Sequence, residues 1–519
     1  MTQNGGIDPS RAPGHSQQRA DTDITCDVLV VGGGVNGTGI ARDLTGRGLT
    51  VVLCEQDDLA SGTSSASTKL IHGGLRYLEH FEFRLVREAL IERERLLGLA
   101  PHIIWPMSFV LPHTAGQRPA WMIRLGLMLY DRLGGRQRLP RSRAIRLDGA
   151  GEGQPLKAAL KRGFVYSDCW VDDARLVVLN AVDAAARGAR VLTRHRCEAL
   201  TAERGTWHGR LVDRQAGGVV DVRARAVVNA AGPWVDRVQR HAMGSNAPRT
   251  VRLVKGSHLV TRRLYDGDHA YLFQHTDGRV VFLIPYEQDY SLIGTTEVDV
   301  ADGPDRPAIE PHEIDYLLSA VGRYLTRPPH RSDIVTTYSG VRPLAGDEDG
   351  DASSVSRDYE LELTGGDGGT PLVLNVYGGK ITTYRALAEQ AADQLVARLG
   401  GVDKPWTGQA PLPGGDMADG DFDGFLADLA ARYGWLPPPM RYRLARAYGT
   451  RVHDLMSGAA GLADLGRDFG HTLFEREVAF LTEREWARTA DDILWRRTKL
   501  GLAFTPAQIE HLSDFLTRR

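Results

Sequence analysis

Hydrophobic positions near the start of the chain form short continuous runs separated by a glycine-rich turn and a helix-like segment. The run VLVV (Val28–Val31) is apolar at every position, which is typical of a strand buried on both faces. The residues from about Val35 to Arg47 are predicted to form a helix, and LTVVLCE, ending at Glu55, a second buried strand. Strand, helix and strand in this order predict a Rossmann-type unit.

Two later segments repeat the pattern of an apolar strand followed by a glycine turn. RAVVNAAGPWVD covers residues 225–236 and turns at Gly232. PLVLNVYGGKITTYRALAEQAADQL starts at Pro371, turns at Gly378 and Gly379 and continues as an amphipathic helix. Alternating polar and apolar positions in GRVVFLIPY and YSLIGTT predict a separate, strand-rich part of the chain.

The last hundred residues have helical spacing. FDGFLADLAARY places Phe422, Phe425, Leu426 and Leu429 on one helix face. TPAQIEHLSDFL has Thr505 as the predicted N-cap, Pro506 at the first helical position, and Ile509, Leu512 and Leu516 facing inward. We expect the nearby pair Arg496 and Arg497 to lie on a solvated helix face.

These patterns predict an α/β fold with a Rossmann-type domain, an interleaved β-rich domain and a C-terminal α-helical domain. The predicted Rossmann-type domain is discontinuous and combines residues 24–95, 164–250 and 335–400. The predicted β-rich domain combines residues 96–163 and 251–334, and the helical domain spans residues 410–519. Residues 1–21 lack an apolar core and are expected to be a disordered tail, not a secretory signal.

Composition limits the function classes. The net charge of −2 argues against a nucleic-acid binder that depends on overall charge. The four cysteines are scattered, with no CxxC pair and no zinc-ligand spacing, so we expect no metal site and a reduced, cytoplasm-facing protein. No run reaches the roughly 18 apolar residues that span a bilayer, so any membrane contact is expected to be peripheral.

The glycine-rich turn after the first strand predicts a dinucleotide site. In GGGVNG, the residues Gly32, Gly34 and Gly37 have GxGxxG spacing around Gly33, and the helix that follows directs its N-terminal amides at a pyrophosphate. Glu55 ends the second strand, where a carboxylate accepts hydrogen bonds from an unphosphorylated ribose. The distal Gly378-Gly379 turn and helix, together with the segment around Gly232, favour the longer FAD over NAD.

One stretch, TSSASTKLIHGGLRYLEH (Thr63–His80), combines hydroxyl residues, a glycine pair and several cations. Together with VLVVGGGVNGTGIARD, GFVYSDCWVDDARLV, NAAGPWVD, KGSHLV, IGTTEVD, YSGVRPL, VYGGKITTYRALAE, DFGH and EWARTADDILWRRTKLGL, it resembles the FAD-dependent glycerol-3-phosphate dehydrogenases of the quinone-reducing bacterial respiratory type. The motifs occur in order from about Asp27 to Thr517. The N-terminal tail and the insert TGGDGGTP (Thr364–Pro371) depart from the pattern, and neither falls inside a motif.

The resemblance implies oxidation of glycerol 3-phosphate to dihydroxyacetone phosphate, with hydride transfer to flavin N5 and electrons passed to a membrane quinone. It implies that the Rossmann-type domain is the FAD-binding domain and that the β-rich domain is the substrate domain. It implies that the FAD is lined by Gly32, Gly33, Gly34, Gly37, Glu55, Thr63, Ser64, Ser65, His72, Gly73, Gly74, Gly232, Gly378, Gly379 and Lys380. It implies that the substrate is bound by Arg76, Tyr77, Arg342 and Arg357, because a phosphate dianion favours forked cations.

Three residues are candidates for the chemistry: His258, Arg342 and Lys380. We favour His258 as the base, because a neutral imidazole titrates near working pH, with His72 as the second candidate. Arg342 could instead polarise the substrate hydroxyl, and Lys380 could steady the substrate or the reduced ring. His258 could also only hydrogen-bond within its own strand, and Arg357 could be an ordinary ion-pair residue.

Two other interpretations compete with this one: an FAD-dependent amine or amino-acid oxidase of the same fold, and a non-catalytic nucleotide-binding module. For the expected peripheral location on the cytoplasmic face of the inner membrane, the best anchor is the segment Arg118–Arg143, with an apolar helix face and a basic rim. The same pattern fits a helix packed on the substrate domain. The sequence leaves the oligomeric state open, with a homodimer as one option.

Overall fold

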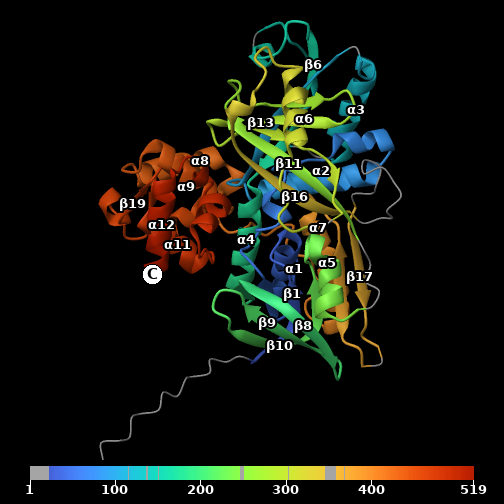
Figure 1. Ribbon diagram of the computed structural model, residues 1–519, viewed down its shortest axis with the longest axis vertical. Helices are drawn as coiled ribbons and strands as arrows, with labels where there is room; N and C mark the ends of the chain where they lie inside the picture. The colour runs from blue at the N-terminus through green and yellow to red at the C-terminus, as the bar shows by residue number, and fades with distance from the viewer. Residues whose placement is uncertain are drawn as a thin grey trace, which may run out of the picture.

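The computed structural model describes residues 23–114, 116–135, 138–149, 151–245, 251–301, 303–344, 358–367 and 369–518. The predicted tail 1–21 and the predicted substrate ligand Arg357 lie outside these ranges. Figure 1 shows a lower body around β1 and α1, an upper body around β11 and β13, and a helical body, coloured orange to red, beside them. The predicted α/β fold, with a Rossmann-type part, a β-rich part and a C-terminal helical part, is confirmed.

The lower body contains an eight-stranded sheet in the order β17-β18-β10-β1-β2-β7, which the β8–β9 hairpin extends through β10. Strands β18, β10, β1, β2 and β7 are parallel to one another, and β17, β8 and β9 pair in antiparallel fashion. The bounds are β1 (Asp23–Val31), β2 (Val51–Glu55), β7 (Arg190–Thr193), β8 (His195–Glu203), β9 (Thr206–Asp213), β10 (Val219–Asn229), β17 (Glu360–Thr364) and β18 (Leu372–Tyr377).

The continuous apolar run of β1 is explained by cover on both faces of this sheet. Val28 and Val30 pack against α1 (Val35–Gly46), α4 (Asp173–Ala186) and α7 (Tyr384–Leu399). Leu29 and Val31 belong to a second core that includes side chains of the β8–β9 hairpin. Neither face of the strand meets water, so no polar position interrupts the run.

The upper body contains a ten-stranded sheet in the order β15-β11-β14-β13-β12-β4-β6-β3, with β16 paired to β11 and β5 to β6. Its strands are β3 (Leu70–Ile71), β4 (Ile104–Pro112), β5 (Arg143–Arg146), β6 (Arg162–Val171), β11 (Arg252–Arg262), β12 (Ala270–Gln274), β13 (Val280–Tyr286), β14 (Tyr290–Gly294), β15 (Val298–Asp299) and β16 (Ile334–Leu344). Helix α6 (Pro311–Gly322) packs on one face, and α2 (Phe83–Leu99) and α3 (Ala120–Leu133) pack on the other.

The predicted domain boundaries differ from the sheets at three strands. We placed residues 70–71, 164–171 and 335–344 in the FAD-binding part, but β3 pairs with β6, β6 with β4 and β16 with β11, all in the second sheet. Pairing partners far away in the sequence decide which sheet a strand joins, and local patterns do not reveal them. Strand β16 nevertheless contacts the turns Thr63–Ser65 and Gly232–Trp234, so it lies at the junction between the sheets.

The helical body has its own apolar core, in which Leu429 and Leu512 are buried as expected. It consists of α8 (Phe422–Arg432), α9 (Pro438–Tyr448), α10 (Val452–Leu455), α11 (Glu475–Arg484), α12 (Pro506–Arg518) and the hairpin β19 (Asp468–Gly470) with β20 (Leu473–Phe474). The expectation of a solvated Arg496-Arg497 pair is wrong: Arg497 is fully buried, and both guanidinium groups bind Asp58 of the lower body. Within the described residues, none of the helices is both long enough and apolar enough to cross a bilayer.

Candidate active site

The glycine-rich turn after β1 is packed so closely that side chains do not fit. Gly32 has φ +116°, and a β-carbon there would lie 2.5 Å from the carbonyl oxygen of Ala230. A β-carbon on Gly37 would lie 1.9 Å from the carbonyl oxygen of Gly32, so only glycine lets α1 start directly against the turn. At Gly34, by contrast, only the Ser64 hydroxyl lies within 4 Å of an added β-carbon, so the loop is open on that side.

Glu55 supports this loop from the end of β2. Its carboxylate accepts hydrogen bonds from the backbone N–H of Gly33 at 2.7 Å and of Asp57 at 2.9 Å, one on each oxygen. Burial raises the pKa of Glu55 to about 7, although both amides favour the ionised form. Each carboxylate oxygen keeps a further lone pair, so Glu55 can still accept a ribose hydroxyl.

The hydroxyl residues of Thr63–Thr68 connect elements that are distant in sequence. The N–H of Val35, at the start of α1, donates to Ser64 Oγ at 3.0 Å, and Thr63 Oγ1 donates to the carbonyl of Val341 on β16 at 2.5 Å. The Thr68 hydroxyl lies 2.9 Å from His258 Nε2. All residues from Gly62 to Thr68 are half-buried, so the loop has a face open for a ligand.

A buried ion pair that the sequence did not predict holds this loop in place. Lys69, at φ +60°, lies with its Nζ 2.8 Å from both carboxylate oxygens of Asp173. The same carboxylate accepts a hydrogen bond from Ser67 Oγ at 2.8 Å. Both residues lie in recognised motifs, but Asp173 follows Lys69 by about a hundred residues, and no local pattern shows that they meet.

The glycine pair that follows is fixed by α3. The Gly73 N–H donates to the Tyr130 hydroxyl at 2.8 Å, and that hydroxyl donates to the Asp168 carboxylate at 2.8 Å. A β-carbon on Gly73 would collide with Leu90, and Gly74 has a left-handed φ of +73°. The turn is therefore held against the upper body. Its neighbour His72 is held from the lower body, because its N–H donates to Thr382 Oγ1, between β18 and α7, at 3.3 Å.

The distal glycine turn meets both the nucleotide loop and the Arg-Tyr pair. The Asn36 side-chain amide of α1 donates to the Gly378 carbonyl at 3.2 Å. Lys380 lies with its Nζ 4.2 Å from the centre of the Tyr77 ring, a cation–π contact. The structure thus brings together Gly379, Lys380 and Tyr77, and Arg76 is half-buried in the same helical turn as Tyr77.

The second sheet presents His258 and Arg342 on one face. In the β11–β16 pair, His258 is opposite Tyr338, Gly256 opposite Gly340, and Val254 opposite Arg342. These positions alternate by two along each strand, so their side chains share one side of the sheet. A β-carbon on Gly256 would lie 3.2 Å from Arg342 Nη2, so the guanidinium extends over the bare glycine pair.

Two residues that contact Arg342 and His258 were not among the predicted site residues. Glu297 Oε1 lies 3.5 Å from Arg342 Nη2, and the Tyr338 ring stacks on the His258 ring with centroids 4.8 Å apart. Both are part of motifs that support the family resemblance, IGTTEVD and YSGVRPL, so the motifs could have pointed to them. They fix the direction of Arg342 and the plane of the imidazole.

His258 is kept neutral by its surroundings. Burial, assisted by the positive charges of Lys69 and Arg342, holds its pKa well below the ordinary 6.5. Its Nε2 contacts the Thr68 hydroxyl, and its Nδ1 has no hydrogen-bond partner among the described residues. Gly294 packs against the ring, where a β-carbon would overlap the imidazole.

The site residues fit a flavin dinucleotide. The N-terminus of α1 and the open side of Gly34 suit a pyrophosphate, and Glu55 suits a ribose. Asn36 Oδ1 is buried near the distal glycine turn without a hydrogen-bond partner among the described residues. Gly232, at φ +56°, begins the turn after β10, and a β-carbon there would meet nothing within 4 Å. A long ligand can therefore extend from β2 past α1 to β16.

Comparison with known proteins agrees with this geometry. The model of the FAD dependent oxidoreductase family matches residues 27–385, and that of the C-terminal domain of alpha-glycerophosphate oxidase matches residues 406–514. The chain is 52% identical to a glycerol-3-phosphate dehydrogenase of Pseudomonas aeruginosa, over 94% of each chain. It is also 52% identical to D-erythritol 1-phosphate dehydrogenase of Brucella abortus, over 93% of this chain and 96% of that relative.

A solved structure shows the same fold. The glycerol-3-phosphate dehydrogenase from Bacillus halodurans, complexed with FAD, matches with a TM-score of 0.71 and 26% identity, over 95% of this chain and 94% of that one. The similarity thus includes the helical domain as well as both sheets. The chain belongs to the FAD-dependent oxidoreductase family, among its glycerol-3-phosphate dehydrogenases, and its cofactor is FAD.

Proposed function

We propose that the protein oxidises the secondary alcohol of sn-glycerol 3-phosphate to dihydroxyacetone phosphate and delivers the electrons to a membrane quinone. The main support is the sheet face on which Arg342 and His258 lie either side of the Gly256–Gly340 pair, beside the loop that lines the cofactor site. A forked cation and a neutral imidazole next to a flavin suit a phosphorylated alcohol.

The cations divide the work of binding the substrate. Arg342, oriented by Glu297, is the proposed phosphate ligand, and its fork can instead polarise the hydroxyl that reacts. Arg76 and Tyr77 extend the site on the side of the glycine pair, and Lys380 lies against Tyr77. Arg357 keeps its proposed role as a phosphate ligand, although it lies outside the described residues.

His258 is the proposed proton acceptor, with His72 as the second candidate. When bound, FAD would supply the acceptor for the hydride that leaves the carbinol carbon of the substrate. The hydroxyl proton must then leave, and a neutral imidazole can take it directly or through the Thr68 hydroxyl, 2.9 Å from Nε2. The low pKa of His258 keeps the ring unprotonated at neutral pH, but it also makes the imidazole a weaker base than a ring that titrates near working pH, as the sequence suggested.

A second phosphorylated alcohol is a candidate substrate. The D-erythritol 1-phosphate dehydrogenase of Brucella abortus has the same sequence identity to this chain as the Pseudomonas aeruginosa relative. D-erythritol 1-phosphate presents a phosphate and a neighbouring alcohol to the same cations. The two substrates differ in chain length, so the specificity depends on how much room the site leaves beyond the reacting carbon.

Helix α3 supports the proposed peripheral contact with the cytoplasmic face of a membrane, where the quinone is dissolved. Five apolar residues on its outer side are exposed: Trp121, Met122, Leu125, Met128 and Leu129. Phe81 and Phe83, just after the Arg-Tyr turn, are also exposed, and Arg118 at the start of the helix pairs with Glu79 of that turn at 3.3 Å. An apolar surface with a basic rim suits anionic lipid. The homodimer stays a prediction.

The visible spectrum of the purified holoenzyme tests the proposal. Anaerobic addition of glycerol 3-phosphate should bleach the flavin band, and a soluble quinone analogue should restore it. D-erythritol 1-phosphate, glycine and D-amino acids are added in parallel. Faster bleaching by D-erythritol 1-phosphate than by glycerol 3-phosphate would identify D-erythritol 1-phosphate as the preferred substrate. Bleaching by an amine alone would favour an amine oxidase. If none of these compounds bleached the flavin, the protein would be a non-catalytic module.

A further inference from the structure

A buried carboxylate connects the helical domain to the loop that carries Glu55. Asp58 is fully buried and accepts hydrogen bonds from Arg497 at 2.8 and 2.9 Å, one on each oxygen. Arg496 adds a third, from its Nε at 2.6 Å. Both arginines come from the helical turn Asp492–Arg497 of the C-terminal domain, more than 430 residues later in the chain.

The Asp58 loop forms one wall of the nucleotide turn. The Asp57 N–H binds the Glu55 carboxylate, and the Ala60 N–H donates to the Gly33 carbonyl at 3.1 Å. A β-carbon on Gly33 would lie 2.7 Å from Glu55 Cβ and 3.0 Å from Leu59 Cδ2, so loop and turn are in contact. A shift of Asp58 therefore moves the groups that meet the ribose and the pyrophosphate.

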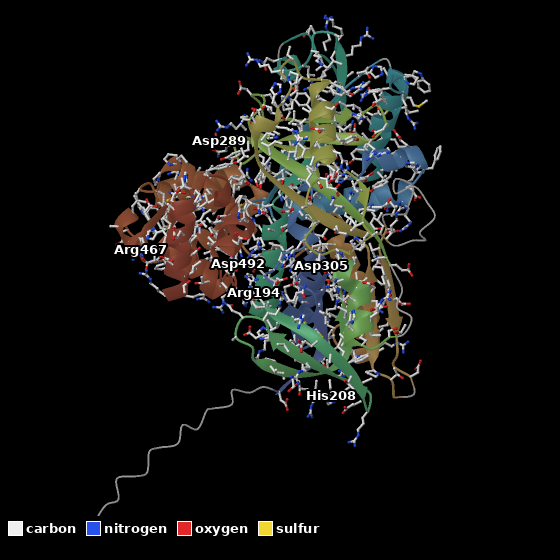
Figure 2. All side chains as sticks on the ribbon, in the orientation of Figure 1. Arg194, His208, Asp289, Asp305, Arg467 and Asp492 are labelled. Atoms are coloured by element: carbon white, nitrogen blue, oxygen red, sulfur yellow. The ribbon has the colours of Figure 1, made fainter. Side chains whose placement is uncertain are left out.

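A second bridge reaches the same loop. Arg194 donates from its backbone N–H to the Asp57 carbonyl at 2.9 Å, and its guanidinium binds both oxygens of Asp492 at 2.7 and 2.8 Å. Figure 2 shows Arg194 and Asp492 next to each other where the helical body meets the lower body. Further along the same segment, Lys499 Nζ lies 3.1 Å from Asp172, the neighbour of the residue that holds Lys69.

We propose that the helical domain sets the affinity of the protein for FAD, because Arg497 positions the Glu55–Ala60 loop through Asp58. Arg497 is a positioning residue: it touches neither cofactor nor substrate. Its removal leaves a buried carboxylate without its bidentate partner, which is strongly unfavourable, and the loop relieves this by moving Asp58 toward water. Glu55 then leaves its place against Gly33, and the nucleotide half of the site loosens.

The test follows flavin release from purified holoenzyme by the rise of FAD fluorescence after dilution. Arg497→Met should release FAD at least ten times faster than the unmodified protein, and Arg497→Lys should recover part of the loss. The matched control is Arg451→Met, since Arg451 binds Glu485 at the same domain contact, at 2.6 Å, without a hydrogen bond to the Asp58 loop. The Arg451→Met variant should release FAD at a rate within twofold of that of the unmodified protein.

A double-mutant cycle on the rate of FAD release distinguishes positioning of the loop from general weakening of the fold. In the Glu55→Gln background, Arg497→Met should accelerate FAD release by a smaller factor than it does in the unmodified protein, because both changes act on one loop. Multiplicative effects, release at the unmodified rate, or equal acceleration by Arg451→Met would each overturn the proposal. If Arg497→Met does not fold, Asp58→Asn is measured in the same way, and an unchanged rate of release has the same meaning.

Discussion

His258 is a neutral imidazole because of groups that come from three parts of the chain. Lys69 precedes it by 189 positions and Arg342 follows it by 84, and both positive charges disfavour a further proton. Tyr338 and Gly294 cover the ring and keep water away from it. Burial and like charge act in the same direction, so the pKa falls well below 6.5.

This state predicts a pH dependence of stability. In the unfolded chain the imidazole binds a proton below pH 6.5, whereas in the folded protein it stays neutral, so the unfolded state gains protons and stability falls as pH decreases below 6.5. The loss approaches about 1.4 kcal/mol per pH unit for such a group. Between pH 7 and 5.5, the midpoint of thermal unfolding should therefore fall by less in His258→Gln than in the unmodified protein. Exposed His312→Gln is the control, and parallel curves for His258→Gln would contradict the assignment.

Arg342 is predicted to contribute to substrate recognition and not to FAD binding. Arg342→Ala removes a charge-assisted contact to phosphate, at a cost of roughly 1.5–3 kcal/mol, which is about a ten- to 150-fold loss in kcat/KM. The flavin absorbance per protein should be unchanged. Arg331→Ala, which removes an exposed arginine paired with Asp315, controls for the general loss of a positive charge. If the kcat/KM of Arg342→Ala equalled that of the unmodified protein, Arg342 would not be a substrate ligand.

At the level of elements, α3 has two sides with different partners. Its inner side buries Leu127 and Tyr130, and the Tyr130 hydroxyl connects the Gly73 amide to the Asp168 carboxylate. Arg93 completes the connection with an ion pair to Asp168 at 2.7 Å. The outer side exposes apolar residues to solvent over the length of the helix, so the helix is fixed from within and free to meet a lipid surface from outside.

The outer side of α3 is therefore predicted to determine vesicle binding. The unmodified protein should co-sediment with vesicles that contain anionic lipid, and less at high salt, because screening weakens the attraction of the basic rim. The double change Leu125→Asp and Leu129→Asp should abolish most of the binding without loss of flavin. Val402→Asp, at an exposed apolar residue elsewhere, is the control. Equal sedimentation of the folded double variant would exclude α3 as the anchor.

The elements also show what the sequence can and cannot predict. The continuous run at Val28–Val31 and the spacing of Gly32 and Gly37 depend on nearby residues, so strand, turn and helix could be predicted. The sheet to which β6 and β16 belong depends on pairing across the whole chain, and their boundaries differed for that reason. The same limit applies to Asp173 and Lys69: each residue is visible in a motif, but their contact is not.

At the level of the whole molecule, buried ion pairs join the helical domain to the lower body. Glu485 and Arg175 are both fully buried and form one such pair, and Arg497 with Asp58 forms another. We expected the arginine pair to lie on a solvated helix face, because arginine side chains are mostly exposed. The structure shows instead that both parts contribute charges of both signs. The helical domain supplies cations to Asp58 and Asp172, and it supplies Glu485 and Asp492 to Arg175 and Arg194.

This contact predicts acid-induced separation of the helical domain. Burial alone would raise the pKa of Glu485, but Arg175, Arg451 and Arg497 lower it to about 2, from 4.5. The depressed pKa of Glu485 stabilises the folded state above pH 4.5, and this contribution, on the order of 3 kcal/mol, is lost as pH falls from 4.5 toward 2. Arg451 and Arg497 belong to the helical domain with Glu485, so separation of the domain removes the part of this stabilisation that is due to Arg175. Small-angle X-ray scattering should therefore show an increase in radius of gyration over that range.

The variant that tests the role of Glu485 is Glu485→Gln, which keeps the shape of the side chain but cannot take up a proton. Its expansion with falling pH should be shallower than that of the unmodified protein, because one group that binds a proton on separation is missing. Asp514→Asn, at an exposed carboxyl of α12, should behave as the unmodified protein does. If Glu485→Gln expands over the same range and as steeply as the unmodified protein, protonation of Glu485 does not drive the separation, and the acids that pair with Arg194 and Arg496 become the next groups to test.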